Sequence, residues 1–230
     1  MKSTSYYIKA RLFPTIISAI PIFSLYFIGI DQQIVDFLNF LEGYKWVGDI
    51  TISAAMVYLF VQLNRFASKE IYQRLYFQDE KNMPTTRFLL NKDDTLSTDI
   101  KVKLYKHIED DFQIKLLKAE EEANDENEAR KRIVTAISQI RKVTRGNNLL
   151  FQHNVEYGFM RNLIGGATIA FIVSVFNIWY FHSYNHNEFG FKLNLVLTFL
   201  YLIPIVFSKL IIGRYGNYYA KILLEQYLTK

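Results

Sequence analysis

A stretch of nineteen residues without a charge, Leu163–Phe181, constrains this chain more than any other feature of the sequence. As an α-helix it would be about 28 Å long, at about 1.5 Å per residue, close to the roughly 30 Å hydrocarbon thickness of a bilayer. It ends in Trp179, Tyr180 and Phe181, and such aromatic side chains gather at the headgroup level of membranes. The stretch therefore predicts a helix that spans a membrane.

Small residues recur every four positions along this predicted helix, at Gly166, Ala170 and Ser174. Small side chains at that spacing let two helix backbones approach closely in lipid. The pattern predicts a close helix contact, within one chain or between copies. The alternative is that these are ordinary small residues of a membrane helix.

Three further apolar runs extend the prediction to four spans. The first is Leu12–Ile30, which is also free of charge, and the others are Trp46–Leu63 and Leu193–Ile212. Pro21 in the first span and Pro204 in the last are expected to bend their helices. The fold class is therefore an all-α integral membrane protein with two transmembrane hairpins.

The long polar segment between the hairpins predicts a separate helical domain. Within it, Ile100, Leu104, Ile108 and Phe112 recur at a spacing of four, which places them on one side of a helix. The predicted organisation has three parts. They are a first hairpin over 1–63, a helical domain over 64–162, and a second hairpin with a tail over 163–230.

The distribution of basic residues predicts the topology. Of the 27 Lys and Arg residues, the two short linkers between paired spans contain only Lys45 and Lys192. Basic residues accumulate on the cytoplasmic side of membrane proteins. Both termini and the central domain are therefore expected in the cytoplasm, and the membrane is taken to be the bacterial inner membrane.

Neither the composition nor any motif points to an enzyme. The chain has no cysteine, which excludes disulfides and thiolate metal sites, and it has no Walker loop, G-x-S-x-G or H-E-x-x-H motif. His182 and His186 have a spacing that can bind a metal on a helix. We expect them to be interfacial polar residues, and we expect no metal, no cofactor and no binding of nucleic-acid polymers.

A loop with two hydroxyls and nearby cations is the first candidate for ligand contact. Thr85, Thr86 and Arg87 follow Pro84, and Lys92 lies close by in the sequence. Such a loop could hold an anion or a nucleotide phosphate. The alternative is a turn in which the threonines bond to the local backbone.

A basic helix face is the second candidate. The residues expected to make contact are Arg130, Arg132, Arg141 and Arg145. They could bind anionic headgroups, a nucleotide or an acidic partner. The alternative is a solvated face that is salt-bridged to the neighbouring acidic run, Glu120–Glu128.

Polar residues also mark the start of the third span. Glu156, Arg161 and Asn162 lie there beside aromatic residues, where a cytosolic event would be coupled to movement of membrane helices. The alternative is that they anchor the helix end at the headgroups.

Three segments carry a resemblance to a known group of proteins. Met83–Leu90, Asp110–Ile114 and Asn154–Asn162 resemble segments of the four-span membrane effectors of bacterial anti-phage defence systems of the cyclic-oligonucleotide (CBASS) type. The resemblance implies an effector that is inactive until a nucleotide or protein signal arrives, and that then oligomerises or opens and damages the membrane. It supplies no ligand motif to carry over.

Three functional hypotheses follow. The first is an inner-membrane defence effector that acts as a homo-oligomer and senses a cyclic nucleotide or a co-encoded soluble protein. The second is a non-conducting scaffold or regulatory subunit that recruits a soluble defence partner. The third, a constitutive channel or transporter, needs a polar site at mid-membrane, for which the spans offer mainly Asn177 and hydroxyl side chains.

Overall fold

The computed structural model describes residues 2–29, 48–78 and 80–229, with side chains in the second range described from residue 54. Every regular element in these ranges is helical, which confirms the all-α prediction for the described chain. The predicted spans that include residues 30 and 46–47 extend outside these ranges.

The described chain forms two compact units. The first contains Met1–Tyr72 and Gly158–Ser208, and the second contains Gln73–Tyr157 and Lys209–Lys230. These divisions lie at other positions than the predicted boundaries after residues 63 and 162.

The first unit begins with a nearly continuous helical segment, Lys2–Gly29, which we call the first helical segment. It comprises α1 (Lys2–Tyr7), η1 (Ile8–Leu12), α2 (Phe13–Ser18), α3 (Ile20–Ser24) and η2 (Leu25–Gly29). The two η elements are π-helical. Pro14 and Pro21 lie in the first turns of α2 and α3, and a turn at Ala19 separates these two helices.

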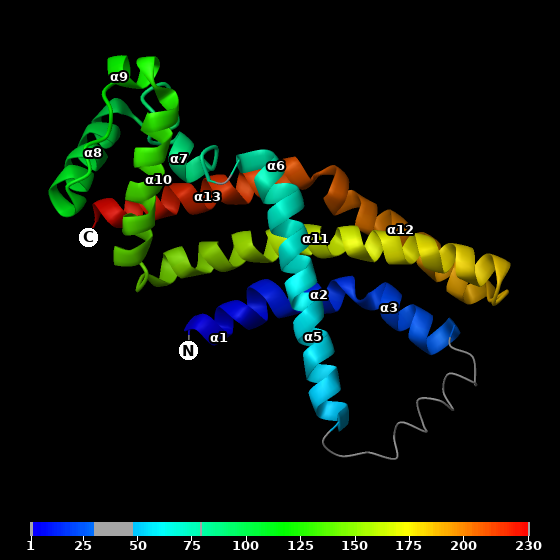
Figure 1. Cartoon of the computed structure of the whole chain (residues 1–230). Coiled ribbons are helices and arrows are strands. Elements are labelled where there is room, and N and C mark those ends of the chain that lie inside the picture. Colours follow the sequence, from blue (N-terminus) through cyan, green and yellow to red (C-terminus); the bar gives the residue numbers. More distant parts are fainter. Residues whose placement is uncertain (1, 30–47, 79, 230) are drawn as a thin grey trace. The chain divides into compact units, whose positions relative to one another are not determined.

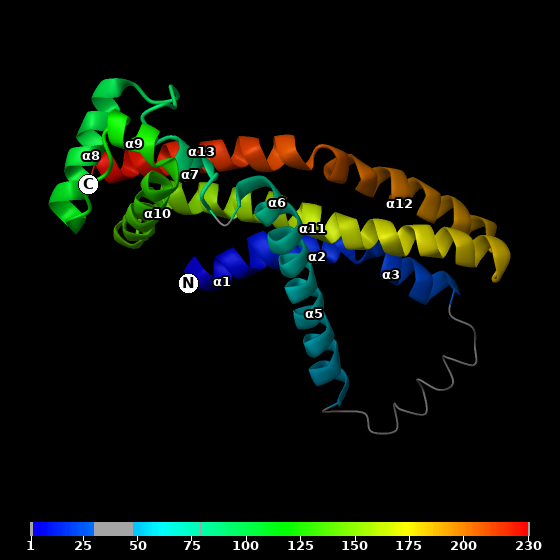
Figure 2. The same ribbon diagram turned by 45° about the horizontal axis from the view of Figure 1, so that its top comes forward.

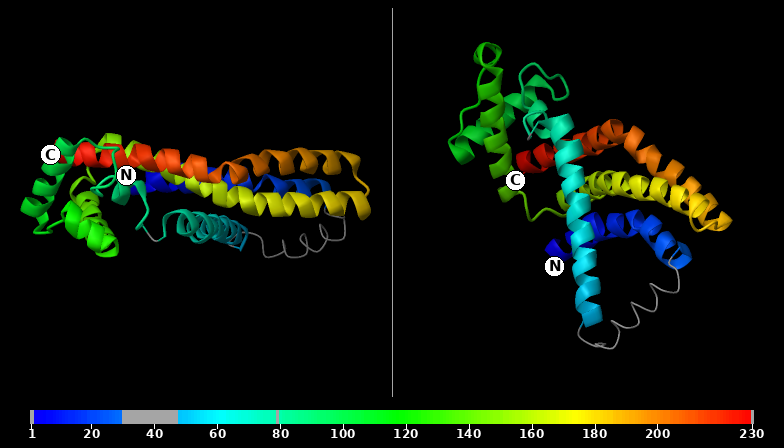
Figure 3. Two further views of the ribbon diagram at one scale, coloured as in Figure 1. Left: turned by 90° about the horizontal axis from the view of Figure 1, so that it is seen from above. Right: turned by 45° about the vertical axis from the view of Figure 1, so that its right-hand side comes forward.

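Three helices of the described chain are long and apolar enough to cross a membrane: Lys2–Gly29, α11 (Asn148–Ser183) and α12 (Glu188–Val206). The first, third and part of the fourth predicted spans fall in them. Figures 1 and 3 show these three helices running side by side.

The predicted second span falls on α5 (Gly48–Phe66), which is not among these three helices. Its apolar character is weakened by Asp49, Gln62 and Asn64. Helix α5 continues into η4 (Ala67–Gln73), and Figure 1 shows α5 crossing the first helical segment and α11 instead of lying alongside them. The two helices of the first predicted hairpin therefore cross each other and do not lie side by side.

The predicted fourth span, Leu193–Ile212, is divided in the structure. Helix α12 ends at Val206, two residues after Pro204, and α13 (Ser208–Leu228) starts a separate helix (Figure 2). Pro204 lies inside α12, and the helix continues for two residues beyond it to a turn at Phe207, whose N–H donates to the carbonyl of Ile203 over 3.1 Å.

The buried face of the first helical segment consists of small or polar residues, and we call it the inner face. Its members are Ala10, Pro14, Thr15, Ser18, Pro21 and Ser24. The large apolar side chains point away from the unit. They include Phe13, Ile16, Ile20, Phe23 and Phe27, which are 42–77% exposed.

Helices α11 and α12 have the same distribution of outward-facing side chains. The exposed large residues are Ile172, Val175, Phe176 and Trp179 on α11 and Val196, Phe199, Leu200, Ile203 and Val206 on α12. A soluble protein rarely exposes so large an apolar surface. In a bilayer, by contrast, apolar side chains face lipid and small residues mediate helix contacts. The first unit is therefore compatible with a multi-pass membrane protein.

The second unit contains shorter helices: α6 (Arg74–Phe77), α7 (Pro84–Arg87), α8 (Thr98–Phe112), α9 (Ala119–Asn124), α10 (Glu126–Val143), the start of α11, and α13. Figure 2 shows α8, α9 and α10 grouped at one end of α13. The core is apolar. It includes Leu89, Leu90, Leu104, Ile108, Ile133, Ile137, Ile140, Leu223 and Leu224, each 2% exposed or less.

Candidate functional site

The prolines of the first helical segment each leave a backbone carbonyl that another helix satisfies. Pro14 has no N–H to donate to the carbonyl four residues before it, that of Ala10. Asn162 of α11 donates from Nδ2 to this oxygen over 2.6 Å. Proline is tolerated in membrane helices because neighbouring helices supply such bonds.

Pro21 has a corresponding hydrogen-bond arrangement, in which the donor comes from α12. The carbonyl four residues before it belongs to Ile17, and the hydroxyl of Tyr201 on α12 donates to it over 2.6 Å. The two prolines thus join the first helical segment to both α11 and α12. The prolines lie in the first helical segment, whereas the side chains that bond to the freed carbonyls come from α11 and α12, far away in the sequence.

Hydroxyl groups of the inner face also bind the end of α5. Asn64 donates from Nδ2 to Thr15 Oγ1 over 3.1 Å and to Ser18 Oγ over 2.8 Å. Ser68, one turn later, donates to Oδ1 of Asn162 over 2.9 Å. These bonds connect η4 and α5 with both the first helical segment and α11.

Ser24, Asn177 and Asn194 meet at the other end of the inner face, and we call them the polar cluster. Asn177 donates from Nδ2 to the carbonyl of Pro21 over 2.7 Å and to Oδ1 of Asn194 over 3.0 Å. Ser24 donates to the same Asn194 oxygen over 3.1 Å. All three side chains are buried, so three helices converge on one neutral polar site.

Two buried oxygens on α11 have no hydrogen-bond partner among the described residues: Ser174 Oγ and Asn177 Oδ1. Both residues are 0% exposed. They are three positions apart, so they lie on one face of the helix with Cβ atoms about 5–6 Å apart. A buried polar atom without a partner is costly, and such atoms typically bind ordered water.

Close backbone contacts bring these polar groups together. A Cβ on Gly165 would lie 2.5 Å from the carbonyl oxygen of Asn64 and 2.6 Å from the amide nitrogen of Ser68. A Cβ on Gly166 would lie 2.6 Å from Ser18 Oγ. Only glycine permits α5 and the first helical segment to approach α11 this closely.

The predicted packing face of Gly166, Ala170 and Ser174 is buried in the first unit. Gly166 lies against Ser18 of the first helical segment, and Ala170 packs with Leu197 of α12. These contacts lie within one chain. A contact of the same face between copies stays a prediction.

The three predicted coupling residues have different surroundings. Glu156 lies in the second unit, where Oε2 is 3.4 Å from Nδ1 of His153. Arg161 lies half-buried in the first unit, and Asn162 is buried there as the partner of Ala10 and Ser68. Asn162 thus holds the start of the membrane-spanning part of α11 in place.

Thr85, Thr86 and Arg87, which were predicted in a loop, lie in the short helix α7, and the threonines face the interior of the second unit. Thr85 and Thr86 are each 1% exposed, and the hydroxyl of Thr86 donates to the carbonyl of Glu80 over 2.8 Å. Arg87 is half-exposed, with Nε 3.2 Å from the carboxylate of Asp93. The hydroxyls therefore bond to local backbone or are enclosed, as in the alternative of a capped turn, and Arg87 alone faces outward.

Most of the predicted basic surface is ion-paired within the second unit. Glu126 lies between Lys92, at 2.6 Å, and Arg130, at 2.7 Å. Hydrogen bonds from Lys92 and then Arg130 hold the pKa of Glu126 below its usual value. Two further ion pairs in this unit join a basic and an acidic residue: Arg132 with Glu128 and Arg141 with Glu80.

Arg145 is exposed beyond the end of α10, and the structure gives it no acidic partner in the ion pairs of the described chain. Arg130 and Arg132 pair with Glu126 and Glu128 of the acidic run, as in the salt-bridged alternative, whereas Arg141 pairs with Glu80 outside that run. Contact of these residues with a ligand stays a prediction.

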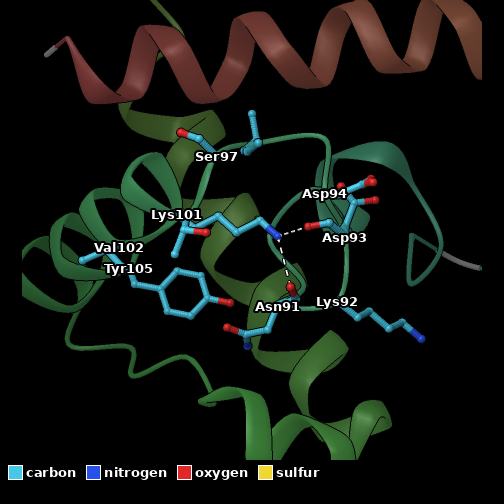
Figure 4. A pocket seen from close by; sticks show the side chains of 10 residues that line it. Asn91, Lys92, Asp93, Asp94, Ser97, Lys101, Val102 and Tyr105 are labelled. Atoms are coloured by element: carbon cyan, nitrogen blue, oxygen red, sulfur yellow. Dashed lines mark hydrogen bonds between the residues drawn. The ribbon is translucent and has the colours of Figure 1, made fainter.

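A pocket of about 390 Å³ lies beside the loop between α7 and α8 (Figure 4). The buried Lys101 donates from Nζ to the carbonyls of Leu90, at 2.6 Å, Asn91 and Asp93. An ammonium group has three N–H donors, so these carbonyls use all of them. Lys101 therefore fixes the loop and leaves no donor for a ligand.

Two more side chains hold the same loop. The hydroxyl of Tyr105 donates to the carbonyl of Leu89 over 2.5 Å, and the buried carboxylate of Glu122 accepts from the amide nitrogen of Asn91 over 2.9 Å. Burial, together with the negative charge of Glu122, raises the pKa of Tyr105, so the phenol remains a donor.

Sequence reasoning missed the polar cluster and Lys101, although both left a signal. Thr15 and Ser18 are three positions apart, which is the spacing of one helix face, and Ser24 follows them in the same otherwise apolar run. Lys101 precedes Leu104 by three positions and Ile108 by seven, so it lies on the apolar face of α8. A basic residue on such a face indicates backbone acceptors nearby.

No group of three or more metal-ligating side chains occurs in the described ranges. Comparison of the chain with protein families, curated proteins and solved structures found no match.

Proposed function

We propose that this chain is a multi-pass effector of the bacterial inner membrane. The proposal takes α5 as a fourth crossing beside the three apolar helices, so that the second unit and both termini lie in the cytoplasm, where this unit receives a nucleotide or protein signal. The helices of the first unit, assembled as a homo-oligomer, then permeabilise the membrane. The chain carries out no catalysis itself.

The observation that carries this proposal is the construction of the first unit. Its helices are joined by neutral hydrogen bonds, such as those of Asn177 and Asn162, while its large apolar side chains face outward. A hydrogen bond between membrane helices contributes about 0.6–2 kcal/mol. The binding energy of a signal is therefore large enough to rearrange several of them.

The connections between the two units add support. The chain passes from one unit to the other after Tyr72, after Tyr157 and after Ser208. These points fall inside η4, α11 and the first turn of α13. A helical connection transmits displacement better than an irregular loop, so a signal in the second unit can reach the helices of the first.

The role in defence rests on the resemblance of Met83–Leu90, Asp110–Ile114 and Asn154–Asn162 to four-span effectors. It is tested by recording membrane potential with a voltage-sensitive dye in bacteria that carry the full chain and its neighbouring genes, with and without phage. We expect depolarisation only after infection. Cells without the chain provide the baseline.

A matched pair of variants separates loss of the protein from loss of response. Gly165→Leu should abolish the depolarisation, because its side chain would collide with the backbone of α5. Gly213→Ala should behave like the parent chain, since a Cβ there has no neighbour within 4 Å.

Absence of depolarisation in both conditions contradicts the effector. A co-encoded soluble protein that co-purifies with the chain would then favour the non-conducting scaffold.

A further inference from the structure

We propose that water and small monovalent cations cross the first unit along the inner face of the first helical segment, inside a single chain. This inference rests on the proposed function, because it assigns the path of the permeabilisation. It departs from the simpler view that any pore of so small a protein forms between copies.

The inner face carries polar atoms over most of the thickness of a bilayer. They run from the carbonyl of Ala10 through Thr15, Ser18 and the carbonyl of Ile17 to Ser24. Fourteen residues separate Ala10 from Ser24, which corresponds to about 21 Å of helix. Successive polar groups are no more than six residues apart.

Two buried oxygen atoms mark a position at which an ordered water molecule would bind. Ser174 Oγ and Asn177 Oδ1 have no partner among the described residues, and Asn177 also donates to Pro21 and Asn194 of the polar cluster. A single water between the two oxygens would satisfy both, given the spacing of side chains three positions apart on a helix. The polar cluster is thus a hydration site within the path.

The chemistry of the lining selects cations over anions. The six residues of the inner face carry no charge, and the carbonyls of Ala10 and Ile17, which accept from Asn162 and Tyr201, each have a second lone pair. Carbonyl and hydroxyl oxygens replace the hydration shell of a small cation. An anion would find the Nδ2 donors of Asn177 and Asn64 already bonded, to the carbonyl of Pro21 and to the hydroxyl of Ser18.

The path is closed in this structure. Gly166 brings α11 against Ser18, and the side chains of Thr15, Ser18 and Ser24 are all buried. Separation of the first helical segment from α11 would expose oxygens and amides to water. The large apolar side chains on the opposite face, such as Phe23 and Phe27, would stay in lipid.

The chain contains no cysteine, so single cysteines report on each face without a background. Thr15→Cys, Ser18→Cys and Ser24→Cys probe the inner face, and Ile16→Cys, Ile20→Cys and Phe23→Cys are matched lipid-facing controls in the same helix. Infected bacteria carrying each full-length variant would be treated with a cationic methanethiosulfonate, and both labelling and depolarisation would be measured.

We expect the inner-face cysteines to be labelled at least tenfold faster after infection than before it, and the label to reduce the depolarisation. The lipid-facing cysteines should show neither effect. A variant that does not accumulate is replaced by the neighbouring inner-face position, so that at least two positions report.

Two results overturn the inference, and they differ from each other. Depolarisation with no labelling of the inner face, or with blocking only at lipid-facing positions, places the path between copies and leaves the proposed function intact. Absence of depolarisation in the parent chain overturns the proposed function, and the inference is overturned with it.

Discussion

The two units of this protein distribute their side chains in opposite ways. The second unit encloses Leu104, Ile108 and Ile137 and leaves its ion pairs at the surface. The first unit encloses Thr15, Ser18, Ser24 and four asparagines and leaves large apolar side chains such as Phe23 and Ile172 outside.

The difference is the one expected if the second unit faces water and the first unit faces lipid. In water, burial of apolar surface stabilises a fold by about 25 cal/mol per Å², so large aliphatic residues belong inside. In lipid this driving force is absent, and close packing with interhelical hydrogen bonds takes its place. The two units of one chain therefore place their large apolar side chains oppositely, inside in one and outside in the other. The same kind of substitution should have opposite effects in the two units.

The largest effect is expected in the core of the second unit. Leu104→Ala should destabilise that unit by about 2–5 kcal/mol, because it removes a fully buried side chain and leaves a cavity. Hydrogen exchange of α8 and α10 in the full chain would measure the change. Val102→Ala on the exposed side of the same helix is the control. Equal effects of the two substitutions would contradict the assigned core.

A charge placed on each outer surface should have a large effect in one unit and almost none in the other. Ile172 and Val102 are both 63% exposed. Ile172→Lys should cost about 2.5–3.5 kcal/mol at membrane insertion, and Val102→Lys should stay within about 0.5 kcal/mol. Membrane-fractionated yield and thermal unfolding in detergent would be compared. If Ile172→Lys accumulates normally, its surface does not face lipid.

A smaller effect is expected from a single interhelical hydrogen bond. Tyr201→Phe removes the hydroxyl that satisfies the carbonyl of Ile17 and leaves the ring in place. We expect a loss of about 0.6–1.7 kcal/mol, measured by denaturation of the first unit in mixed detergent. Tyr184→Phe, at a 75% exposed position, should have no effect. A neutral Tyr201→Phe would show that Pro21 needs no compensation from α12.

The smallest effect concerns the ion pairs of the second unit. The folded-state pKa of Glu126 lies below its ordinary value, so its contribution is present above that ordinary value and is lost as the pH falls through the folded-state pKa. Glu126→Gln should therefore reduce stability at neutral pH by about 0.2–1 kcal/mol and have little effect in acid. Unfolding of α10 by hydrogen exchange at two pH values would measure this. A larger loss in acid would reverse the assigned sign.

The helical class and the positions of three apolar helices could be predicted from the sequence, because the length of an apolar run and its lack of charge are local properties. The apolar face of α8 was also predictable from the spacing of Leu104 and Ile108. The division of Leu193–Ile212 was not, since Pro204 permits either a bend or a break. The pairing of Asn162 with Ala10 depends on contacts far apart in the chain, which periodicity does not encode.

The candidate site was predicted in part. Asn162, Gly166 and Ser174 were identified from position and spacing, and all three are buried in the first unit. The partners Ser24, Asn177 and Asn194 meet only through the packing of three helices. Lys92 and Arg130 pointed to a ligand in the sequence, but Glu126 approaches both of them in the fold.

The central claim is that the two units face different solvents, and spin-label accessibility tests it most directly. Phe199→Cys and Val102→Cys replace residues that are both 63% exposed, in a chain with no other cysteine. Each labelled full-length chain would be placed in lipid nanodiscs and exposed to oxygen and to a water-soluble nickel chelate. We predict that oxygen collides more often with the label at 199 and the chelate with the label at 102. Frequent chelate collisions at 199 would contradict the account.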